Sequence, residues 1–175
     1  LVPRVVVIAE SEDDVRAVLD VCDAADTPLT FRAAGTSLSG QAISDSVLVL
    51  LGEGFRQIKV RDGGAAIRLG PAVIGAHANR ALAPLGRKIG PDPASIDAAK
   101  IGGIAANNAS GMCCGTRENS YHTLVGVRVM LADGAVLDTE DASSVAAFRA
   151  SHPQLLEGLA RLAQRTRDDP ALAAR

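Results

Sequence analysis

The sequence predicts an α+β fold of two subdomains, a small parallel β-α-β unit followed by a mixed or antiparallel sheet flanked by helices. Two observations indicate this arrangement. Residues 4–51 follow the order strand, helix, strand, loop and strand, which is typical of a parallel unit with a crossover helix. From residue 55 onward, pairs of short strands surround glycine-containing turns, which indicates antiparallel hairpins. We therefore expect the first subdomain to cover about residues 1–52 and the second about residues 53–175.

The elements of the first subdomain are predicted from strand composition and a helix cap. The run Arg4–Ala9 is rich in β-branched residues and has the length of a strand. Ser11 precedes three acidic residues, and apolar residues then recur at helical spacing. Residues 12–25 are therefore predicted to form a helix with Ser11 as its N-cap. Leu29–Phe31 and Val47–Leu51 are the two further strands, separated by a loop of small residues.

The second subdomain is predicted to contain two hairpins and three helices. Asp62-Gly63-Gly64 and Ala132-Asp133-Gly134 are the two turn signals, and each lies between runs of apolar residues. The predicted strands cover residues 58–60, 66–69, 124–131 and 135–137, and the predicted helices cover residues 73–85, 142–149 and 153–167. Between these elements, a segment of unusual composition runs from Gly90 to Gly115.

Composition narrows the class of ligand. Apolar residues make up 47% of the 175 residues and aromatic residues only 2%, so we expect a core of Val, Ile, Leu and Ala. So few aromatic residues argue against a stacking platform for single-stranded nucleic acid. A net charge of −2 and a pI of about 5.9 also argue against binding a polyanion. A small anionic ligand stays compatible, because backbone N–H groups and a few side chains suffice to hold one.

Neither a membrane span nor a metal site is predicted. No apolar run approaches 18 residues. The three cysteines are too few and too badly spaced for a disulfide framework or a zinc site, and a reducing, cytoplasmic setting fits them. Cys22 occupies an apolar helical position and is expected in the core. The adjacent pair Cys113-Cys114 is either reactive or simply two small side chains beside a turn.

The loop Ala33–Ala42 is the first of two glycine-rich segments. Small residues and hydroxyls follow a strand directly, so backbone N–H groups can approach an anion closely, and Arg32 can add charge. The glycine spacing is that of a nucleoside-triphosphate loop, but Gln41 and Ala42 replace the required Lys and hydroxyl residue. The dinucleotide fingerprint G-x-G-x-x-G is also absent. A tight structural loop without a ligand stays open as the alternative.

The second segment runs from Gly90 to Ser95 and continues over residues 101–111. Prolines are followed by a run of Gly, Ala, Asn and Ser, which suits a backbone that lies against something large and flat. That partner could be a ligand or another chain. Tight packing of a buried helix N-terminus would explain the small residues equally well. The two segments together suit an extended ligand with a diphosphate and two ring systems.

At these residues the sequence resembles the FAD-linked oxidase family, whose FAD-binding domain is shared with vanillyl-alcohol oxidase and p-cresol methylhydroxylase. The first segment resembles the family pattern Arg-Gly-Gly-Gly-Thr-Ser-Leu-Ser-Gly, with Ala33 and Ala34 where Gly is commoner. The second resembles the stretch Pro-Asp-Pro…Ile-Gly-Gly…Asn-Asn-Ala-Ser-Gly-Met…Cys-Gly-Thr. The sequence is most similar to the D-lactate and glycolate dehydrogenase branch, and the resemblance spans nearly the whole chain.

The resemblance implies which residues hold FAD. In the first segment, the residues that wrap its pyrophosphate through backbone N–H groups are Ala34, Gly35, Thr36, Ser37, Leu38, Ser39, Gly40 and Gln41. In the second segment, those that line its adenosine, pyrophosphate and flavin sides are Pro91, Ser95, Gly102, Gly103, Asn107, Ser110 and Gly111. Thr36 stands where some family members carry the His that attaches FAD covalently, so the resemblance implies non-covalent FAD.

The resemblance also implies a longer protein. The family chain continues into a Gly-Ser-Glu-Gly-Thr-Leu-Gly segment and a substrate-binding domain, and neither occurs in residues 1–175. We therefore expect the truncated FAD-binding portion of a 2-hydroxy-acid dehydrogenase, D-lactate- or glycolate-like, which is inactive alone. Its small substrate is expected to bind a missing C-terminal domain, and no catalytic residue is assigned. Two alternatives stay open: a cofactor- or nucleotide-binding module without its own chemistry, and a structural fragment that contacts a partner chain.

The three histidines are considered because imidazole titrates near neutral pH. His77 is expected on the core-facing side of a helix, and His152 at the surface between two helices. His122 follows the second glycine-rich segment closely enough to approach a cofactor. No spacing with Asp or Ser supports nucleophilic catalysis.

Overall fold

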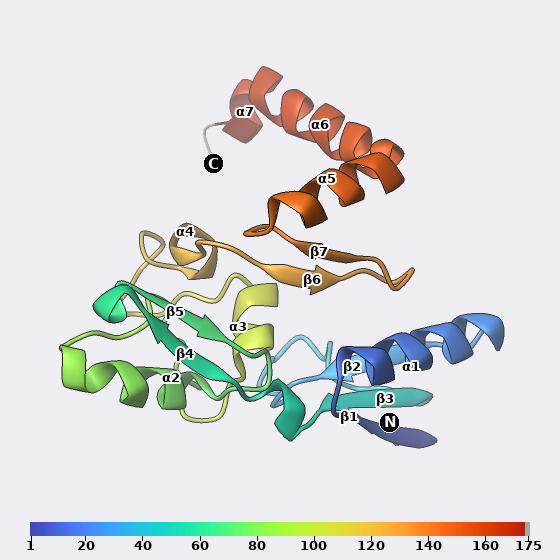
Figure 1. The fold of residues 1–175 in the computed structure, drawn as a ribbon, viewed down its shortest axis with the longest axis horizontal. Helices are drawn as coiled ribbons and strands as arrows, with labels where there is room; N and C mark the ends of the chain where they lie inside the picture. The colour runs from blue at the N-terminus through green and yellow to red at the C-terminus, as the bar shows by residue number, and fades with distance from the viewer. Residues whose placement is uncertain (174–175) are drawn as a thin grey trace. The chain divides into compact units, whose positions relative to one another are not determined.

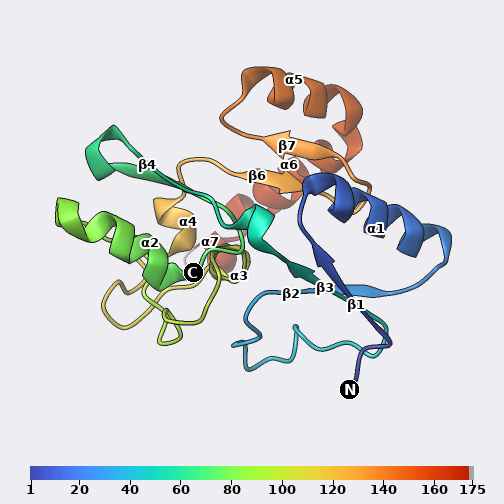
Figure 2. The same ribbon diagram turned by 60° about the horizontal axis from the view of Figure 1, so that its bottom comes forward.

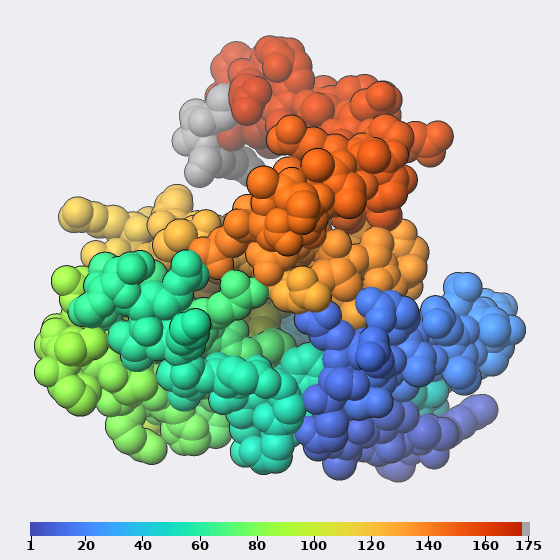
Figure 3. Space-filling view, viewed as in Figure 1, coloured from blue at the N-terminus to red at the C-terminus, as the bar shows by residue number. Residues whose placement is uncertain are grey.

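The computed structural model describes residues 1–173, which form two compact units (Figures 1 and 3). The first unit is Leu1–Val125, and the second begins at Gly126. One parallel sheet and two antiparallel strand pairs, with helices beside them, confirm the predicted fold class. The division near residue 52 stays a prediction. Among the described residues, no helix is both long and apolar enough to cross a membrane.

The parallel sheet consists of β1 (Val5–Ala9), β3 (Val47–Leu51) and β2 (Leu29–Arg32) in that order. Val47 in β3 pairs with the first residue of each neighbouring strand. Leu48 and Val49 are buried, because the central strand is covered on both faces. Both neighbouring strands run parallel to β3, as predicted.

Helix α1 (Glu12–Ala24) begins at a capping box. The Asp14 N–H donates to Ser11 Oγ at 3.1 Å, and the Ser11 N–H donates to Asp14 Oδ2 at 3.0 Å. The N–H groups of Glu10 and Ser11 and the Ser11 side chain hold the pKa of Asp14 below its ordinary value, and the Glu10 contribution is the largest. The predicted N-cap is confirmed, and so is the core position of Cys22, which is 6% exposed.

The rest of the first unit contains one hairpin, three short 3₁₀ helices and three α-helices. The strands are β4 (Ile58–Arg61) and β5 (Ala66–Leu69), with Gly63 at φ 60° in the turn between them. Short 3₁₀ helices are η1 (Glu53–Phe55), η2 (Asp62–Gly64) and η3 (Ala83–Leu85), and the α-helices are α2 (Gly75–Leu82), α3 (Ile101–Ala106) and α4 (Ser120–Thr123).

The predicted start of α2 at residue 73 is wrong. The carbonyl of Val73 accepts from the Ile101 N–H at 2.8 Å, and Ile74 forms a β-bridge with Lys100. This stretch is therefore extended, and the helix begins at Gly75. His77 is exposed, so its predicted core-facing position is also wrong.

The second unit contains β6 (Arg128–Met130), β7 (Val136–Asp138), α5 (Ala142–Ser151), α6 (Pro153–Asp168) and α7 (Pro170–Ala173). Strand β6 is shorter than predicted, because β7 offers only three partners. His152 separates α5 from α6, and its side chain is only 16% exposed. Its ring stacks on Phe148 with centroids 4.3 Å apart, and its Nε2 donates to Asp133 Oδ2 at 2.8 Å. His152 lies between the two helices as predicted, and these two contacts leave its side chain half-buried instead of fully exposed.

Candidate cofactor site

A cleft of about 270 Å³ lies between the two glycine-rich segments, entirely within the first unit. Figures 1 and 2 show the loop after β2 lying beside α3. Residues that line the cleft are Phe31, Ala33, Ala34, Gly35, Thr36, Ser37, Gln41 and Ala42 from the first side, and Pro93, Ser95, Ala99, Lys100, Gly103, Ile104, Ala106, Asn107 and Ala109 from the second. The volume is at the lower limit of about 300–1,000 Å³ for small-molecule sites, so the cleft suits one part of a dinucleotide.

At Gly103 the second segment comes close to the first. A Cβ built on Gly103 would lie 3.3 Å from the Cβ of Ala33, so any side chain at this position would press on the first loop. The start of α3 is held by the segment that precedes α2. The N–H groups of Ile101 and Gly102 donate to the carbonyls of Val73 and Pro71 at 2.8 and 2.9 Å. These two N–H groups therefore hold the helix in place.

The first loop presents backbone donors without protein acceptors. Among the described residues, no acceptor pairs with the N–H groups of Ala34, Gly35, Thr36 and Ser37. Gly35 and Gly40 have φ values of 70° and 75°, in the left-handed region that favours glycine. An exposed loop of this kind bonds water when free and can bond an anion in its place.

One positively charged side chain lines the cleft, and another lies against this loop. Lys100 lines the cleft and is half-buried. Arg32 lies outside the lining, but its guanidinium touches the loop: a Cβ on Gly35 would lie 2.6 Å from the Arg32 Nη2. Within the described part of the chain, neither side chain forms an ion pair with a carboxylate. The site therefore combines uncompensated positive charge with backbone donors.

Hydroxyl and amide groups complete the lining. Ser37 Oγ contacts Gln41 Oε1, and the Ser39 N–H donates to Ser37 Oγ at 3.4 Å. On the second side, Ser95 and Asn107 present polar side chains between small residues. The cleft thus offers small polar groups and close backbone approach, which suit a diphosphate.

Eight of the fifteen predicted site residues line this cleft: Ala34, Gly35, Thr36, Ser37, Gln41, Ser95, Gly103 and Asn107. The other seven lie outside it: Leu38, Ser39, Gly40, Pro91, Gly102, Ser110 and Gly111. Leu38 is fully exposed at the tip of the first loop. Gly111 has a packing role, because a Cβ there would lie 1.8 Å from the carbonyl oxygen of Asp92. Contact of these seven residues with a cofactor stays a prediction.

Sequence reasoning missed part of the lining. Phe31 precedes the loop by two residues and faces the same side of β2 as Ala33, as strand periodicity requires. On the second side, Lys100, Gly103 and Asn107 recur at spacings of three and four, which place them on one face of α3. Strand alternation applied to the sequence would have found Phe31, whereas Lys100 depends on α3, a helix that the sequence did not predict.

The histidines and cysteines lie elsewhere. His122 Nδ1 lies 2.7 Å from the carbonyl oxygen of Thr116, and His77 is exposed on α2. Cys114 is buried, with its Sγ 3.3 Å from the carbonyl oxygen of Gly115. Among the described residues, no histidine or cysteine lines the cleft, and no cluster of three metal-ligating side chains occurs.

The residues on both sides of the cleft match a known protein family. The sequence profile described as FAD binding domain matches residues 3–140, which include both sides of the cleft. The chain belongs to the FAD binding domain family. The predicted family and the predicted cofactor, FAD, are therefore confirmed.

This FAD binding domain is similar to parts of larger proteins. It is 33% identical over 137 residues to the glycolate oxidase subunit GlcD of Escherichia coli (strain K12), a match that covers 77% of this chain and 28% of that protein. It is 27% identical over 144 residues to D-2-hydroxyglutarate dehydrogenase of the same organism, which covers 80% of this chain and 14% of that protein. The chain thus spans less than a third of either relative.

Solved structures show the same fold. The 6-hydroxy-D-nicotine oxidase of Arthrobacter nicotinovorans matches with a TM-score of 0.67 and 19% identity, over 79% of this chain and 30% of that one. Glucooligosaccharide oxidase from Acremonium strictum matches with a TM-score of 0.64 and 18% identity, over 78% of this chain and 29% of that one. At this identity the likeness concerns the fold alone.

Proposed function

We propose that this chain is the FAD-binding portion of a flavin-dependent dehydrogenase that acts on a small 2-hydroxy acid, of the D-lactate or glycolate type. The observation that carries the proposal is the cleft itself: residues 34–37, whose N–H groups have no acceptor among the described residues, line one side, and small residues of α3 line the other. The names of the relatives, glycolate oxidase subunit and D-2-hydroxyglutarate dehydrogenase, support the substrate class.

Different residues of the cleft bind different parts of FAD. The N–H groups of Ala34–Ser37 donate to the pyrophosphate, and Gly103 lets the ligand approach the backbone of α3. Ser95 and Asn107 provide hydrogen bonds along the same side. When bound, FAD supplies the two-electron chemistry that oxidises the carbon bearing the substrate hydroxyl. The substrate site is assigned to a part of the protein beyond residue 175.

Non-covalent binding is part of the proposal. The FAD of glucooligosaccharide oxidase is described as 6-S-cysteinyl, 8α-N1-histidyl. Of the described residues that line the cleft in this chain, none is a Cys or a His, and Thr36 offers a much weaker nucleophile. Cofactor is therefore expected to leave the protein on denaturation.

FAD binding by the 175-residue chain tests the proposal. Flavin fluorescence quenching and calorimetry are expected to give saturable binding, with one FAD per chain. In Gly40→Arg this binding is expected to be lost, because a bulky residue would occupy a position with φ 75° in the first loop. Absence of binding in both this chain and a longer one that continues past residue 175 would contradict the proposal.

Activity separates this proposal from a binding module without its own chemistry. A longer chain loaded with FAD is expected to reduce an artificial electron acceptor when D-lactate or glycolate is added. FAD binding without substrate-dependent reduction would favour the binding-module alternative, whereas full activity in the 175-residue chain would overturn the assignment of the substrate site.

A further inference from the structure

Lys100 is distinguished by its charge. Among the described residues that line the cleft, it is the one charged side chain, and no acidic residue shares the lining. The rest of the lining consists of small, apolar or neutral polar residues. The protein as a whole carries 20 acidic and 18 basic side chains, so its overall charge does not attract an anion. Attraction must be local, and Lys100 is placed to supply it.

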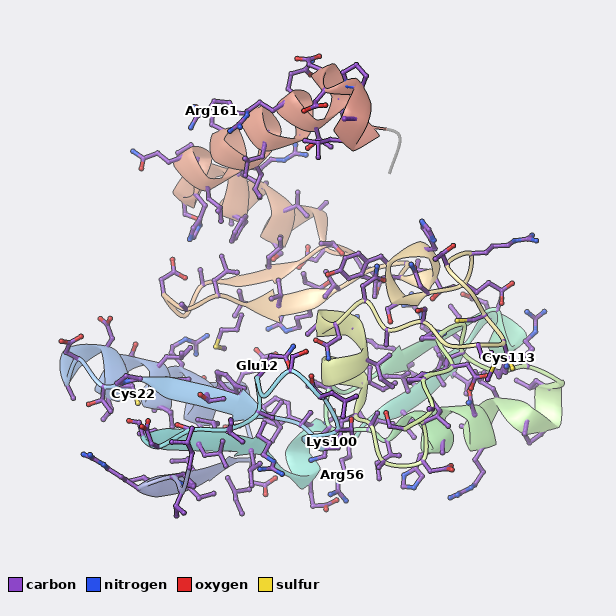
Figure 4. All side chains as sticks on the ribbon, turned by 180° about the vertical axis from the view of Figure 1, so that it is seen from behind. Glu12, Cys22, Arg56, Lys100, Cys113 and Arg161 are labelled. Carbon is purple, nitrogen blue, oxygen red and sulfur yellow. The ribbon has the colours of Figure 1, made fainter. Side chains whose placement is uncertain are left out.

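The backbone of Lys100 is held firmly. It forms a β-bridge with Ile74, and it is the N-cap residue of α3. The neighbouring groups are also paired: the Ala99 carbonyl accepts from the Gly75 N–H at 2.9 Å, and the Ile101 N–H donates to Val73. The side chain therefore starts from a fixed point at the edge of the cleft, at the base of α3 (Figure 4).

The surroundings of Lys100 strengthen its field. The side chain is half-buried, where screening by water is weaker than at an open surface. No ion pair within the described part of the chain neutralises it. A lysine ammonium offers three donors, and hydrogen bonds between charged groups are about twice as strong as neutral ones.

We propose that Lys100 is a binding residue for the pyrophosphate of the cofactor and provides the charge that the first loop lacks. The loop contributes neutral N–H donors on one side of the cleft, and Lys100 contributes a positive charge on the other. This inference rests on the proposed function, because it assumes that FAD occupies the cleft. Arg32, whose guanidinium lies against Gly35, adds a second positive charge outside the lining.

The test compares four versions of the 175-residue chain by calorimetry with FAD at low and high salt. Lys100→Met keeps the apolar stem and removes the charge, and Lys100→Arg keeps the charge. Lys59→Met is the matched control, because Lys59 is exposed on β4 outside the cleft. Loss of a charge-assisted hydrogen bond is expected to weaken FAD binding about 10- to 100-fold in Lys100→Met.

Salt dependence distinguishes charge from shape. The dissociation constant of the wild-type chain is expected to rise with salt, and that of Lys100→Met to rise less steeply, with the remaining dependence due to Arg32. Lys100→Arg is expected to recover most of the affinity, and Lys59→Met to match the wild type. Equal affinity and equal salt dependence in wild type and Lys100→Met would overturn the inference alone. A wild-type chain that does not bind FAD, together with a longer chain that fails as well, would overturn the proposed function and this inference with it.

Discussion

The first loop of the first unit and the turns of the second unit differ in whether their backbone N–H groups have acceptors within the protein. Among the described residues, the N–H groups of Ala34–Ser37 have no protein acceptor. In the second unit, side chains close the turns: Asp133 accepts from Ala135, Ser144 from Asp138 and Asp141 from Ser143, at 2.9–3.0 Å. Both regions are rich in short polar residues, so composition alone does not distinguish them.

The difference supports the proposal that a ligand binds the first loop and not the turns of the second unit. Asx-type turns satisfy their own donors and need nothing else. In a glycine-containing loop without protein acceptors, the N–H groups bond water and can bond an anion in its place. The positions of Lys100 and Arg32 near that loop agree with this interpretation, whereas the carboxylates of Asp133 and Asp141 would repel an anion at the turns of the second unit.

The largest expected effect comes from filling the cleft. Gly103→Leu would press on Ala33 and occupy space between the two segments, so FAD affinity is expected to fall by at least about 100-fold, the equivalent of about 2.7 kcal/mol. Gly158→Leu is the matched control, because a Cβ on Gly158 in α6 meets nothing within 4 Å. Calorimetry with FAD measures both variants. Equal FAD affinity in the two variants would contradict the proposal that FAD binds in the cleft.

A smaller effect is expected from stiffening the first loop. Gly35→Ala and Gly63→Ala both place a side chain at positive φ, 70° and 60°, so each is expected to lose about 1–2 kcal/mol of stability. Only Gly35→Ala also displaces the Arg32 guanidinium, so only this variant is expected to bind FAD about 10-fold more weakly. Thermal unfolding and calorimetry measure the two properties separately. Weakened FAD binding in Gly63→Ala would show that strain alone accounts for the effect.

Replacing one serine in each region tests the comparison through the free energy of unfolding. Ser144 Oγ accepts from the Asp138 N–H at 2.9 Å, and Asp138 is buried. Ser144→Ala would remove that hydrogen bond and is expected to cost about 1 kcal/mol of stability, with FAD affinity unchanged. Ser39→Ala, in the exposed first loop, is expected to leave the free energy of unfolding unchanged. Denaturant unfolding of both variants tests this, and a larger loss in Ser39→Ala would reverse the comparison.

The smallest expected effect concerns pH. A hydrogen bond from His152, followed by one from the Ala135 N–H, holds the pKa of Asp133 below its ordinary value. Hydrogen bonds from Ser143 lower the pKa of Asp141 in the same way. Because each folded-state pKa lies below the unfolded value, the stabilisation is complete above the ordinary pKa, about 3.9, and is lost as pH falls through the folded value.

Carboxyl NMR titration checks this pH dependence residue by residue. Asp133 and Asp141 are expected to titrate below pH 3.9. His152→Phe keeps a ring against Phe148 but has no N–H donor, so it is expected to move the pKa of Asp133 back toward the ordinary value while leaving Asp141 unchanged. An Asp133 pKa that does not respond to His152→Phe would contradict the hydrogen-bond assignment.

Strong local signals made much of the fold predictable. The acidic residues after Ser11 predicted the capping box, and the β-branched runs predicted the parallel sheet. Helices α3 and α4 were not predicted, because α3 is built from Gly, Ala and Ile and α4 has only four residues. Such segments carry little apolar periodicity, and long-range packing forms them: Ser120 Oγ donates to the carbonyls of Ile104 and Ala109 at 3.0 Å.

The site was predictable in outline and less so in detail. Two small-residue segments predicted a common site, and residues of both line one cleft in the structure. Whether they share a ligand stays a prediction. The role of Lys100 was missed, because nothing local to that residue shows that it shares a cleft with a loop more than sixty positions earlier in the chain. The contact of His152 with Asp133 is hidden in the same way, because the two residues are 19 positions apart in the sequence.

Amide NMR of the labelled 175-residue chain during an FAD titration compares the first loop with the turns of the second unit in one experiment. We expect the N–H signals of Ala34–Ser37 and of Gly103 to shift with saturable dependence on FAD, while those of Ala135, Asp138 and Ser143 stay in place. Shifts confined to the second unit, with the first-loop signals unchanged at saturating FAD, would contradict the claim that unpaired donors mark the cofactor site.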